Sequence, residues 1–161
     1  MAELRESVEV PVDAATVWRA LTDWERQGEW MLITRVTTTA QDGQGVGGGI
    51  EGWTGIGPVG FRDSMVIRTW DPPRRCIVRH SGWPVRGAGI FEIEPLGPSR
   101  ARFTWGEVLD LPFGLLGRLG FALLRPGVAW GVRLSLRRFA SWVPQWAAAN
   151  PANPADRPSA P

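Results

Sequence analysis

Three titratable side chains fall at positions where the alternation of predicted strands turns them toward one surface. Asp63, His80 and Glu107 each lie in a run whose charged or polar neighbours occupy the opposite set of alternate positions. His80 is the only histidine of the chain, and an imidazole can act as a general base near neutral pH. Asp63 and Glu107 could instead form an acid/base pair in an apolar pocket. The chemistry that these residues suggest is proton transfer.

Each of the three residues also has a structural interpretation. A histidine on a strand commonly bonds to a neighbouring strand or to a carboxylate, and buried carboxylates commonly pair with an arginine. We favour the structural interpretation and keep proton transfer by His80, Asp63 or Glu107 as the alternative.

Other kinds of chemistry have less support in the sequence. One histidine, one cysteine and scattered acids do not supply a tetrahedral nitrogen and sulfur set, so no metal site is predicted. Cys76 lies in a predicted strand without a clear partner, and no Gly-x-Ser-x-Gly motif is present. The glycine-rich run at 45–49 lacks the Lys and Ser/Thr of a phosphate-binding loop. We therefore predict no cofactor.

Seven strands are predicted to position these residues. Glu3–Val10 alternates as a strand, Asp13 caps a following helix, and Asp23 caps a second short turn through Gln27. Gly-, Pro- and Asp-containing turns separate six further strands at Leu32–Ala40, Val46–Gly55, Phe61–Trp70, Arg74–Ser81, Val85–Glu94 and Arg100–Leu109. Short turns between successive strands predict an antiparallel meander.

A long helix is predicted from Phe113 to Trp146. The stripe that recurs every three or four residues is Gly117, Phe121, Leu124, Val128, Val132, Ser135, Phe139, Trp142 and Trp146. We expect Pro126 to kink this helix and Pro144 to fray its last turn. Because one face of the sheet needs a cover, the predicted fold is α+β: a curved seven-stranded antiparallel sheet wrapped around a long C-terminal helix, with two short helices after the first strand.

An apolar cavity is expected between the sheet and this helix. Gly87, Gly89 and Gly117 leave room there, either for close packing of the helix or for a ligand. The predicted lining is Trp53, Asp63, Met65, His80, Phe91, Phe103, Trp105, Glu107, Phe121, Leu124, Val128 and Val132. Apolar walls with a few polar groups are typical of small-molecule sites. The leading hypothesis is therefore the binding of a small hydrophobic, lipid- or polyketide-like molecule.

The helix carries a second apolar set, away from the inner stripe. Its members are Leu116, Leu119, Leu123, Trp130 and Leu134. We expect this set to be buried against the N-terminal helices or the Gly43–Gly60 region. The alternatives are a homodimer interface, in place of a monomer, and docking on a membrane surface helped by Arg118, Arg125 and Arg133.

The composition bears on the kind of partner that the protein binds and on the cell compartment in which it works. All 18 basic residues are arginines, spread along the chain with acids between them, so no nucleic-acid partner is indicated. A single cysteine fits a reducing cytoplasm, and the N-terminus has no signal-peptide pattern. The tryptophans Trp18, Trp24, Trp30, Trp142 and Trp146 are expected to seal the core. Residues 1–147 form the predicted domain, and residues 148–161 a disordered Pro- and Ala-rich tail.

The sequence resembles the SRPBCC superfamily, which includes START lipid-binding domains, the birch-pollen allergen group and polyketide cyclase/dehydrase-like proteins. The segments that carry the resemblance are VPVDAATVWRALTDWERQGEWM, FRDSMVIRTWDPPRRCIVRHSGWPVRGAGIFEIEP and SLRRFASWV, and it extends over Glu3–Trp146. The resemblance implies a helix-grip fold with a hydrophobic cavity and, if the protein is an enzyme, an aromatase/cyclase or dehydratase. The superfamily has no universal catalytic set, so the resemblance assigns no catalytic residue.

Overall fold

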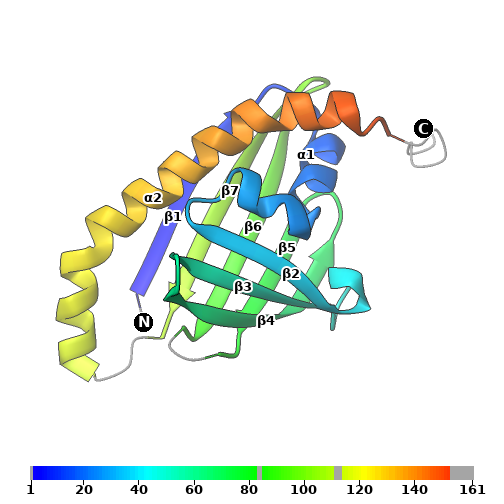
Figure 1. Ribbon diagram of the computed structural model, residues 1–161. Coiled ribbons are helices and arrows are strands. Elements are labelled where there is room, and N and C mark those ends of the chain that lie inside the picture. Colours follow the sequence, from blue (N-terminus) through cyan, green and yellow to red (C-terminus); the bar gives the residue numbers. More distant parts are fainter. Residues whose placement is uncertain (1, 83–84, 111–113, 153–161) are drawn as a thin grey trace.

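The computed structural model describes residues 2–82, 85–110 and 114–152. Within them, one antiparallel sheet has the strand order β1-β7-β6-β5-β4-β3-β2, and a long helix crosses it (Figure 1). The strands are β1 (Ala2–Val10), β2 (Thr34–Ala40), β3 (Gly49–Ile56), β4 (Val59–Asp71), β5 (Arg75–His80), β6 (Gly87–Gly97) and β7 (Arg100–Leu109). The helices are α1 (Ala14–Leu21) and α2 (Gly114–Ala149), with short 3₁₀ turns η1 (Trp24–Glu29) and η2 (Gln41–Gly43). The predicted α+β fold is confirmed.

The N-terminal segment follows the prediction, with one difference. The Asp13 side chain caps α1 by accepting from the backbone N–H of Thr16 at 3.0 Å. Asp23 makes no side-chain cap on η1. Its carboxylate accepts instead from Nε1 of Trp146 at 2.8 Å, and so ties the end of α2 to η1.

Strands β2 and β3 begin later than predicted because residues near their predicted starts have positive φ. Ile33 has a φ of 50°, and β2 starts at the next residue. Gly45 and Gly47 have φ values of 69° and 91°, which place them in a turn, and β3 starts at Gly49. The predicted turn Gly82-Trp83-Pro84 lies partly outside the described residues.

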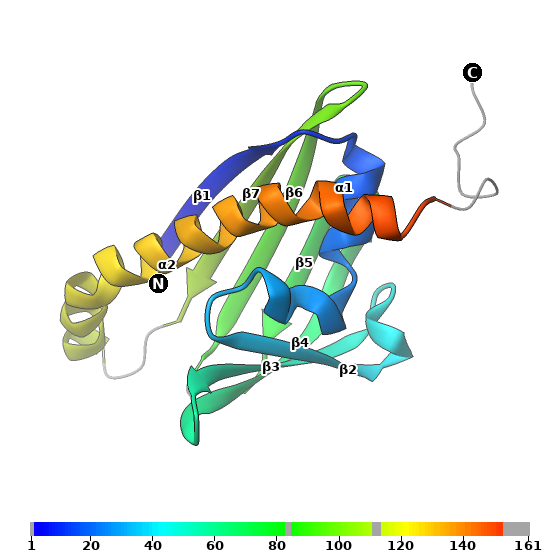
Figure 2. The ribbon, with the colours of Figure 1, turned by 45° about the horizontal axis from the view of Figure 1, so that its top comes forward.

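Alternation correctly predicts which residues of β4 to β7 face α2. Ile67, Val78, Phe91 and Phe103 are buried, whereas arginines at the alternate positions, such as Arg79, are exposed. The sheet curves beneath α2 (Figure 2). This inner face therefore holds the core and also Asp63, His80 and Glu107.

Aromatic rings fill the core beneath the C-terminal part of α2. Phe139 of α2 is fully buried, with its ring centroid 4.8 Å from that of Trp30 and 5.0 Å from that of Phe103. Phe91 lies between Phe103 and Trp105, at 6.2 and 6.0 Å. Such contacts stabilise a core beyond the apolar area that they bury. This part of the space between sheet and helix is a packed core.

Helix α2 is continuous from Gly114 to Ala149, and the predicted start at Phe113 lies outside the described residues. Its N-terminal part, yellow in Figures 1 and 2, turns away from the sheet. Pro126 lies inside the helix and cannot donate a backbone hydrogen bond, which accounts for a change of direction. The predicted fraying at Pro144 is wrong, because α2 continues to Ala149 and the Asn150 backbone N–H donates to the Trp146 carbonyl at 2.9 Å. Of the predicted tail, residues 153–161 lie outside the described part.

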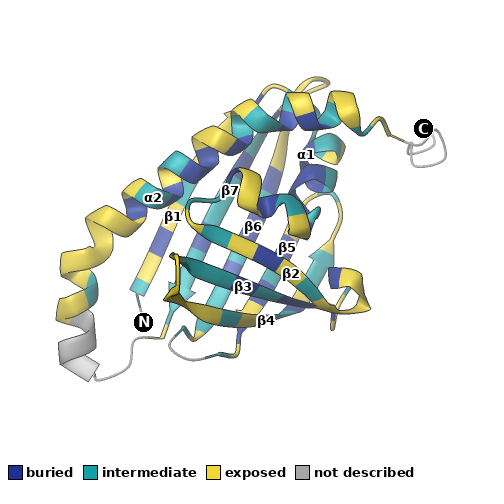
Figure 3. Ribbon diagram, viewed as in Figure 1, coloured by how far each residue is buried: buried dark blue, intermediate teal, exposed yellow. Residues whose placement is uncertain are grey.

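The inner stripe of α2 is covered by the sheet along only part of its length. Val132 and Phe139 of this stripe are buried, but Leu124 is 65% exposed. Figure 3 shows the same change along α2, from mostly exposed residues toward the N-terminal part to a buried side further along. Val128, one turn before Val132, is also exposed. The apolar inner stripe therefore continues beyond the packed core.

The expected burial of the second apolar set of α2 is wrong for the residues whose exposure is described. Leu119, Leu123 and Trp130 are exposed, and Leu134 is half-buried. The side chain of Leu116 lies outside the described part. The N-terminal helices do not cover this face because α1 packs near the other end of α2 (Figure 1).

Candidate ligand-binding site

His80 lies between two carboxylates on the inner face of the sheet. Its Nδ1 is 2.6 Å from Oδ2 of Asp63, and its Nε2 is 3.1 Å from Oε2 of Glu107. The other carboxylate oxygen of Glu107 accepts from Nε1 of Trp105 at 2.7 Å. We refer to Asp63, His80, Trp105 and Glu107 as the His80 network. The structure thus brings together the three titratable residues singled out by the sequence.

Three strands supply the network, and one of them is not adjacent to the others. Asp63 lies on β4 and His80 on the neighbouring β5, whereas Glu107 lies on β7, beyond β6. Neighbouring strands are about 4.8 Å apart, so His80 and Glu107 must reach across two such spacings. Gly89 of β6 lies between them: a Cβ there would be 3.4 Å from both His80 Nε2 and Glu107 Oε1. The same Cβ would lie only 2.9 Å from Cγ2 of Val78, so glycine relieves crowding at the point where the two side chains meet.

Gly87 and Gly89 of β6 have different roles. The sequence suggested that both leave room for a helix or a ligand. Gly87 has a φ of +135°, and a Cβ on it would lie 2.0 Å from the carbonyl oxygen of Val108. Gly87 is thus required by the backbone, whereas a side chain at position 89 would crowd Val78 beside the His80 network. Sequence reasoning missed the second role, because no local pattern shows which side chains meet above a glycine.

The pKa of His80 is raised by its two partners. Burial alone acts to lower it, but the hydrogen bonds and negative charges of Asp63 and Glu107 together outweigh burial and raise the pKa to about 9. The imidazole is then protonated near neutral pH, and each ring N–H donates to a carboxylate. His80 therefore has no free lone pair with which to act as a general base at that pH.

The atoms of the network that can take part in further hydrogen bonds are the carboxylate oxygens of Asp63 and Glu107, which are acceptors. The side chains of Asp63 and Glu107 are 12% and 16% exposed, so both carboxylates lie near the border of the solvent. Oδ1 of Asp63 is buried and has no hydrogen-bond partner within the described part of the chain. An unpartnered buried acceptor is costly, and a donor placed against it would be favoured. One cationic imidazole and two carboxylates give the network a net negative charge.

On the sheet, Met65 and the ring of Trp105 are the apolar groups beside His80 and Glu107, and the other apolar residues predicted to line the cavity differ in exposure. Met65 is paired with His80 across β4 and β5 and is half-buried, as is Trp105. On α2, Phe121 is half-buried, and Leu124 and Val128 are exposed. Phe91, Phe103 and Val132, which were also predicted to line the cavity, are buried; both phenylalanines belong to the aromatic cluster of the core.

Trp53 lies on the opposite face of the sheet from the other predicted site residues. It pairs with Arg62 of β4, and Gly52 next to it pairs with Asp63. Directly paired residues lie on the same face of a sheet, so Trp53 shares the outer face with Arg62 and Glu51, which form an ion pair at 3.1 Å. The prediction that Trp53 lines an inner cavity is wrong.

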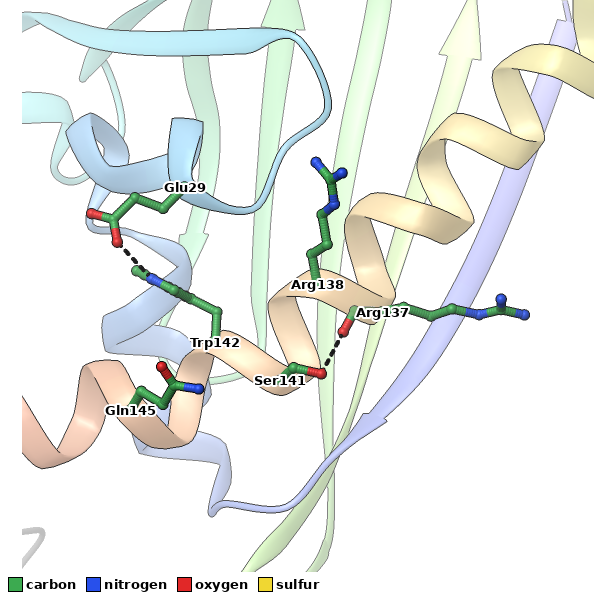
Figure 4. Close-up of a pocket in the computed structure, with 6 residues that line it drawn as sticks. All are labelled: Glu29, Arg137, Arg138, Ser141, Trp142 and Gln145. Atoms are coloured by element: carbon green, nitrogen blue, oxygen red, sulfur yellow. Dashed lines mark hydrogen bonds between the residues drawn. The ribbon is translucent and has the colours of Figure 1, made fainter.

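Two pockets open elsewhere on the described surface. One, of about 480 Å³, lies between η1 and α2 and is lined by Glu29, Arg137, Arg138, Ser141, Trp142 and Gln145 (Figure 4). The other, of about 370 Å³, is lined by Arg5, Asp71, Arg74, Arg75, Glu92, Ile93, Glu94 and Thr104. Arg137 and Arg138 point apart in Figure 4 and form no joint anion site. Neither pocket is lined by the His80 network, so neither is the expected cavity.

The fold and the placement of the site define a helix-grip protein, in which a curved sheet holds a long C-terminal helix. The chain belongs to the family described as polyketide cyclase / dehydrase and lipid transport, which its sequence matches over residues 1–143.

Solved structures with the same fold include two proteins that are named as aromatase/cyclases. TTHA0849 from Thermus thermophilus is 17% identical, with 91% of this chain and 99% of that chain covered and a TM-score of 0.76. The Zhui aromatase/cyclase from Streptomyces sp. R1128 is 17% identical, with 94% and 99% covered and a TM-score of 0.71. The di-domain ARO/CYC BexL from the BE-7585A biosynthetic pathway is 19% identical, with 94% and 48% covered and a TM-score of 0.71. No curated protein matches the sequence.

Proposed function

We propose that the protein binds a small, mostly apolar molecule that carries a hydrogen-bond donor. The molecule would lie between the inner face of the sheet and the N-terminal part of α2. The observation that carries this proposal is a buried ionic network on the inner face of the sheet that includes an unpartnered acceptor, together with an inner stripe of α2 that continues uncovered beyond the core. We call Met65, Trp105, Leu124 and Val128 the guest surface.

The helix side of the guest surface supports an apolar guest. Leu124 and Val128 lie two turns and one turn before Val132, on the stripe that packs against the sheet further along α2. Covering apolar surface contributes about 25 cal/mol per Å² that is removed from water. A guest that covers both residues would extend the core rather than compete with it.

The sheet side supports a neutral guest with a donor group. Both ring nitrogens of His80 are engaged, so the atoms left to accept from a guest are the carboxylate oxygens, of which Oδ1 of Asp63 has no partner within the described part of the chain. A hydroxyl or phenol can donate to these oxygens, and hydrogen bonds to charged groups are worth about 1.5–3 kcal/mol. A carboxylate on the guest would meet the net negative charge of the network. We therefore expect phenolic or hydroxylated guests to be preferred over acids.

The comparisons support the same class of guest. The family description combines polyketide cyclases with lipid transport, and two of the similar structures are named as aromatase/cyclases. Polyketide intermediates and lipids are both mostly apolar molecules with a few oxygen groups. A polyketide-like phenol would fit the guest surface and the acceptors beneath it.

Calorimetric titration with three matched naphthalenes tests this proposal. Naphthol carries the donor, methoxynaphthalene lacks it, and naphthoate replaces it with a negative charge. Naphthol is expected to bind about tenfold more tightly than either of the others. Met65→Gln should weaken naphthol binding, whereas Val59→Gln, an exposed apolar position on the β3–β4 hairpin, should not. Equal affinities for the three compounds, or no binding of any, would refute the proposal.

A second candidate function is that of a cyclase or dehydratase. The specific observation in its favour is that Asp63, His80 and Glu107 meet at the edge of the guest surface. Catalysis would consist largely of orienting a reactive chain. One of the two carboxylates would accept a proton, and His80 would hold both carboxylates in place. The test is turnover of a poly-β-ketone substrate by His80→Gln and Glu107→Gln. If both variants work at the wild-type rate, this candidate is discarded.

A further inference from the structure

A second apolar face of α2 is exposed and has no role in the proposed guest site. Leu119, Leu123 and Trp130 are exposed, and Leu123 is 83% exposed. They lie four and seven residues apart, so they share one face of the helix. We call these three residues the outer stripe. Scattered exposed leucines are ordinary, but three large apolar residues aligned on one helix face indicate a contact surface.

Arginines continue the outer stripe along the same face. Arg133 and Arg137 follow Trp130 by three and seven residues, and both are exposed. Arg133 reaches Glu6 of β1 at 2.8 Å, yet its side chain remains 56% exposed. The face is thus apolar toward the N-terminal part of the helix and cationic toward the C-terminal part, with Trp130 at the boundary.

All the charged residues of α2 are positive. The 36 residues of α2 contain five arginines and neither aspartate nor glutamate. Acids are common elsewhere in the chain, which has 16 of them and a net charge of only +2. A partner of α2 should therefore be anionic where it meets the arginines and apolar where it meets the outer stripe.

We propose that the outer stripe docks on the surface of an anionic lipid bilayer. Leucine and tryptophan side chains of an interfacial helix enter the boundary between headgroups and acyl chains, while arginines reach the lipid phosphates. Each arginine near such a surface contributes to attraction by anionic lipids. The helix would lie on the bilayer, since no helix in the described part of the chain is long and apolar enough to cross a membrane.

A second copy of the chain fits the same face less well. A two-fold contact through the outer stripe would place one acid-free, arginine-bearing helix beside another. Like charges that face each other across a contact oppose association. A bilayer with anionic headgroups satisfies both the apolar and the cationic parts of the face.

Flotation of the full chain with lipid vesicles tests the proposal. We expect binding to vesicles that contain phosphatidylcholine and phosphatidylglycerol, at least about tenfold weaker binding to phosphatidylcholine alone, and release as salt is raised. The variant L123Q/W130Q changes exposed positions and should lose most of the binding. The control I56Q/V59Q removes two comparably exposed apolar residues from the β3–β4 hairpin and should bind like the wild type.

A charge variant separates electrostatic attraction from apolar contact. R133Q/R137Q should bind the anionic vesicles about 10- to 30-fold more weakly, because each arginine contributes about 1 kcal/mol. Failure of the wild type to bind the anionic vesicles, or full binding by L123Q/W130Q, would overturn the proposal. So would light scattering that shows a dimer which L123Q/W130Q converts to a monomer. Naphthol binding should be unchanged in L123Q/W130Q, so the two proposals can fail separately.

Discussion

His80 and Glu107 lie on strands that are not neighbours, yet their side chains meet at 3.1 Å. The intervening strand, β6, presents Gly89 at the crossing point. A Cβ at this position would lie 2.9 Å from Cγ2 of Val78, and 3.4 Å from the polar atoms of both partners. The site therefore depends on a residue that has no side chain to contribute.

Gly89→Ala is expected to disturb this crossing. The added methyl group must displace Val78 or separate His80 from Glu107, and overpacking of this kind costs about 1–3 kcal/mol. The free energy of unfolding should fall by this amount, and the pKa of His80, followed by NMR as the only histidine signal, should fall as well. Gly106→Ala is the matched control, because its Cβ would meet nothing closer than 3.5 Å. Wild-type stability and an unchanged pKa in Gly89→Ala would contradict the role assigned to Gly89.

The stability of the protein should decrease between pH 6.5 and 9. The pKa of His80 in the folded protein, about 9, lies above its ordinary value of 6.5. Protonation therefore favours the folded state, and this contribution is complete below pH 6.5 and lost as the pH rises through about 9. The difference corresponds to about 3 kcal/mol in the free energy of unfolding. Urea titrations across this range should show the decrease in the wild type and not in His80→Gln; a flat wild-type profile would count against the network.

Phe139→Ala should be among the most destabilising substitutions in α2. Its ring is fully buried against Trp30 and Phe103, and removal of such a ring costs about 3–5 kcal/mol. Leu123→Ala, on the same helix but 83% exposed, should change stability by no more than about 0.5 kcal/mol. Chemical unfolding of the two variants provides the comparison. Similar losses in both would mean that the N-terminal part of α2 is packed against something.

The thiol of Cys76 should be unreactive in the folded protein. The residue is fully buried in β5, and burial raises the pKa of its thiol to about 12. Only the thiolate reacts readily, and only when a reagent can reach it. Labelling with Ellman's reagent at mildly alkaline pH should follow unfolding of the chain, and rapid labelling of native protein would show that the core opens there.

The fold and the inward face of most strands could be predicted from the sequence because charged residues mark the outer positions. Arg75 and Arg79 on β5, for example, leave Cys76, Val78 and His80 to face inward, as observed. The same signal was available for Trp53. Glu51 lies two residues before it on β3, and so already indicated that Trp53 faces outward.

The length over which α2 is covered could not be predicted from its periodicity. The inner stripe keeps its spacing from Leu124 to Phe139, but its members are buried only from Val132 onward. Periodicity reports which side of a helix is apolar, whereas coverage depends on where the sheet ends and on how the helix bends. The contact between His80 and Glu107 above Gly89 could not be predicted for a related reason. It depends on how the residues of β5, β6 and β7 pair with one another, and the sequence does not show this pairing.

The central claim is that a guest lies against Met65 and the acceptors of the His80 network. The most direct measurement is NMR of the protein with carbon-13-labelled methionine methyl groups, in the presence of naphthol. We predict intermolecular contacts between naphthol and the methyl group of Met65, together with a shift of the His80 imidazole signal. Contacts confined to Met31, or bound naphthol that leaves both Met65 and His80 unchanged, would contradict the account.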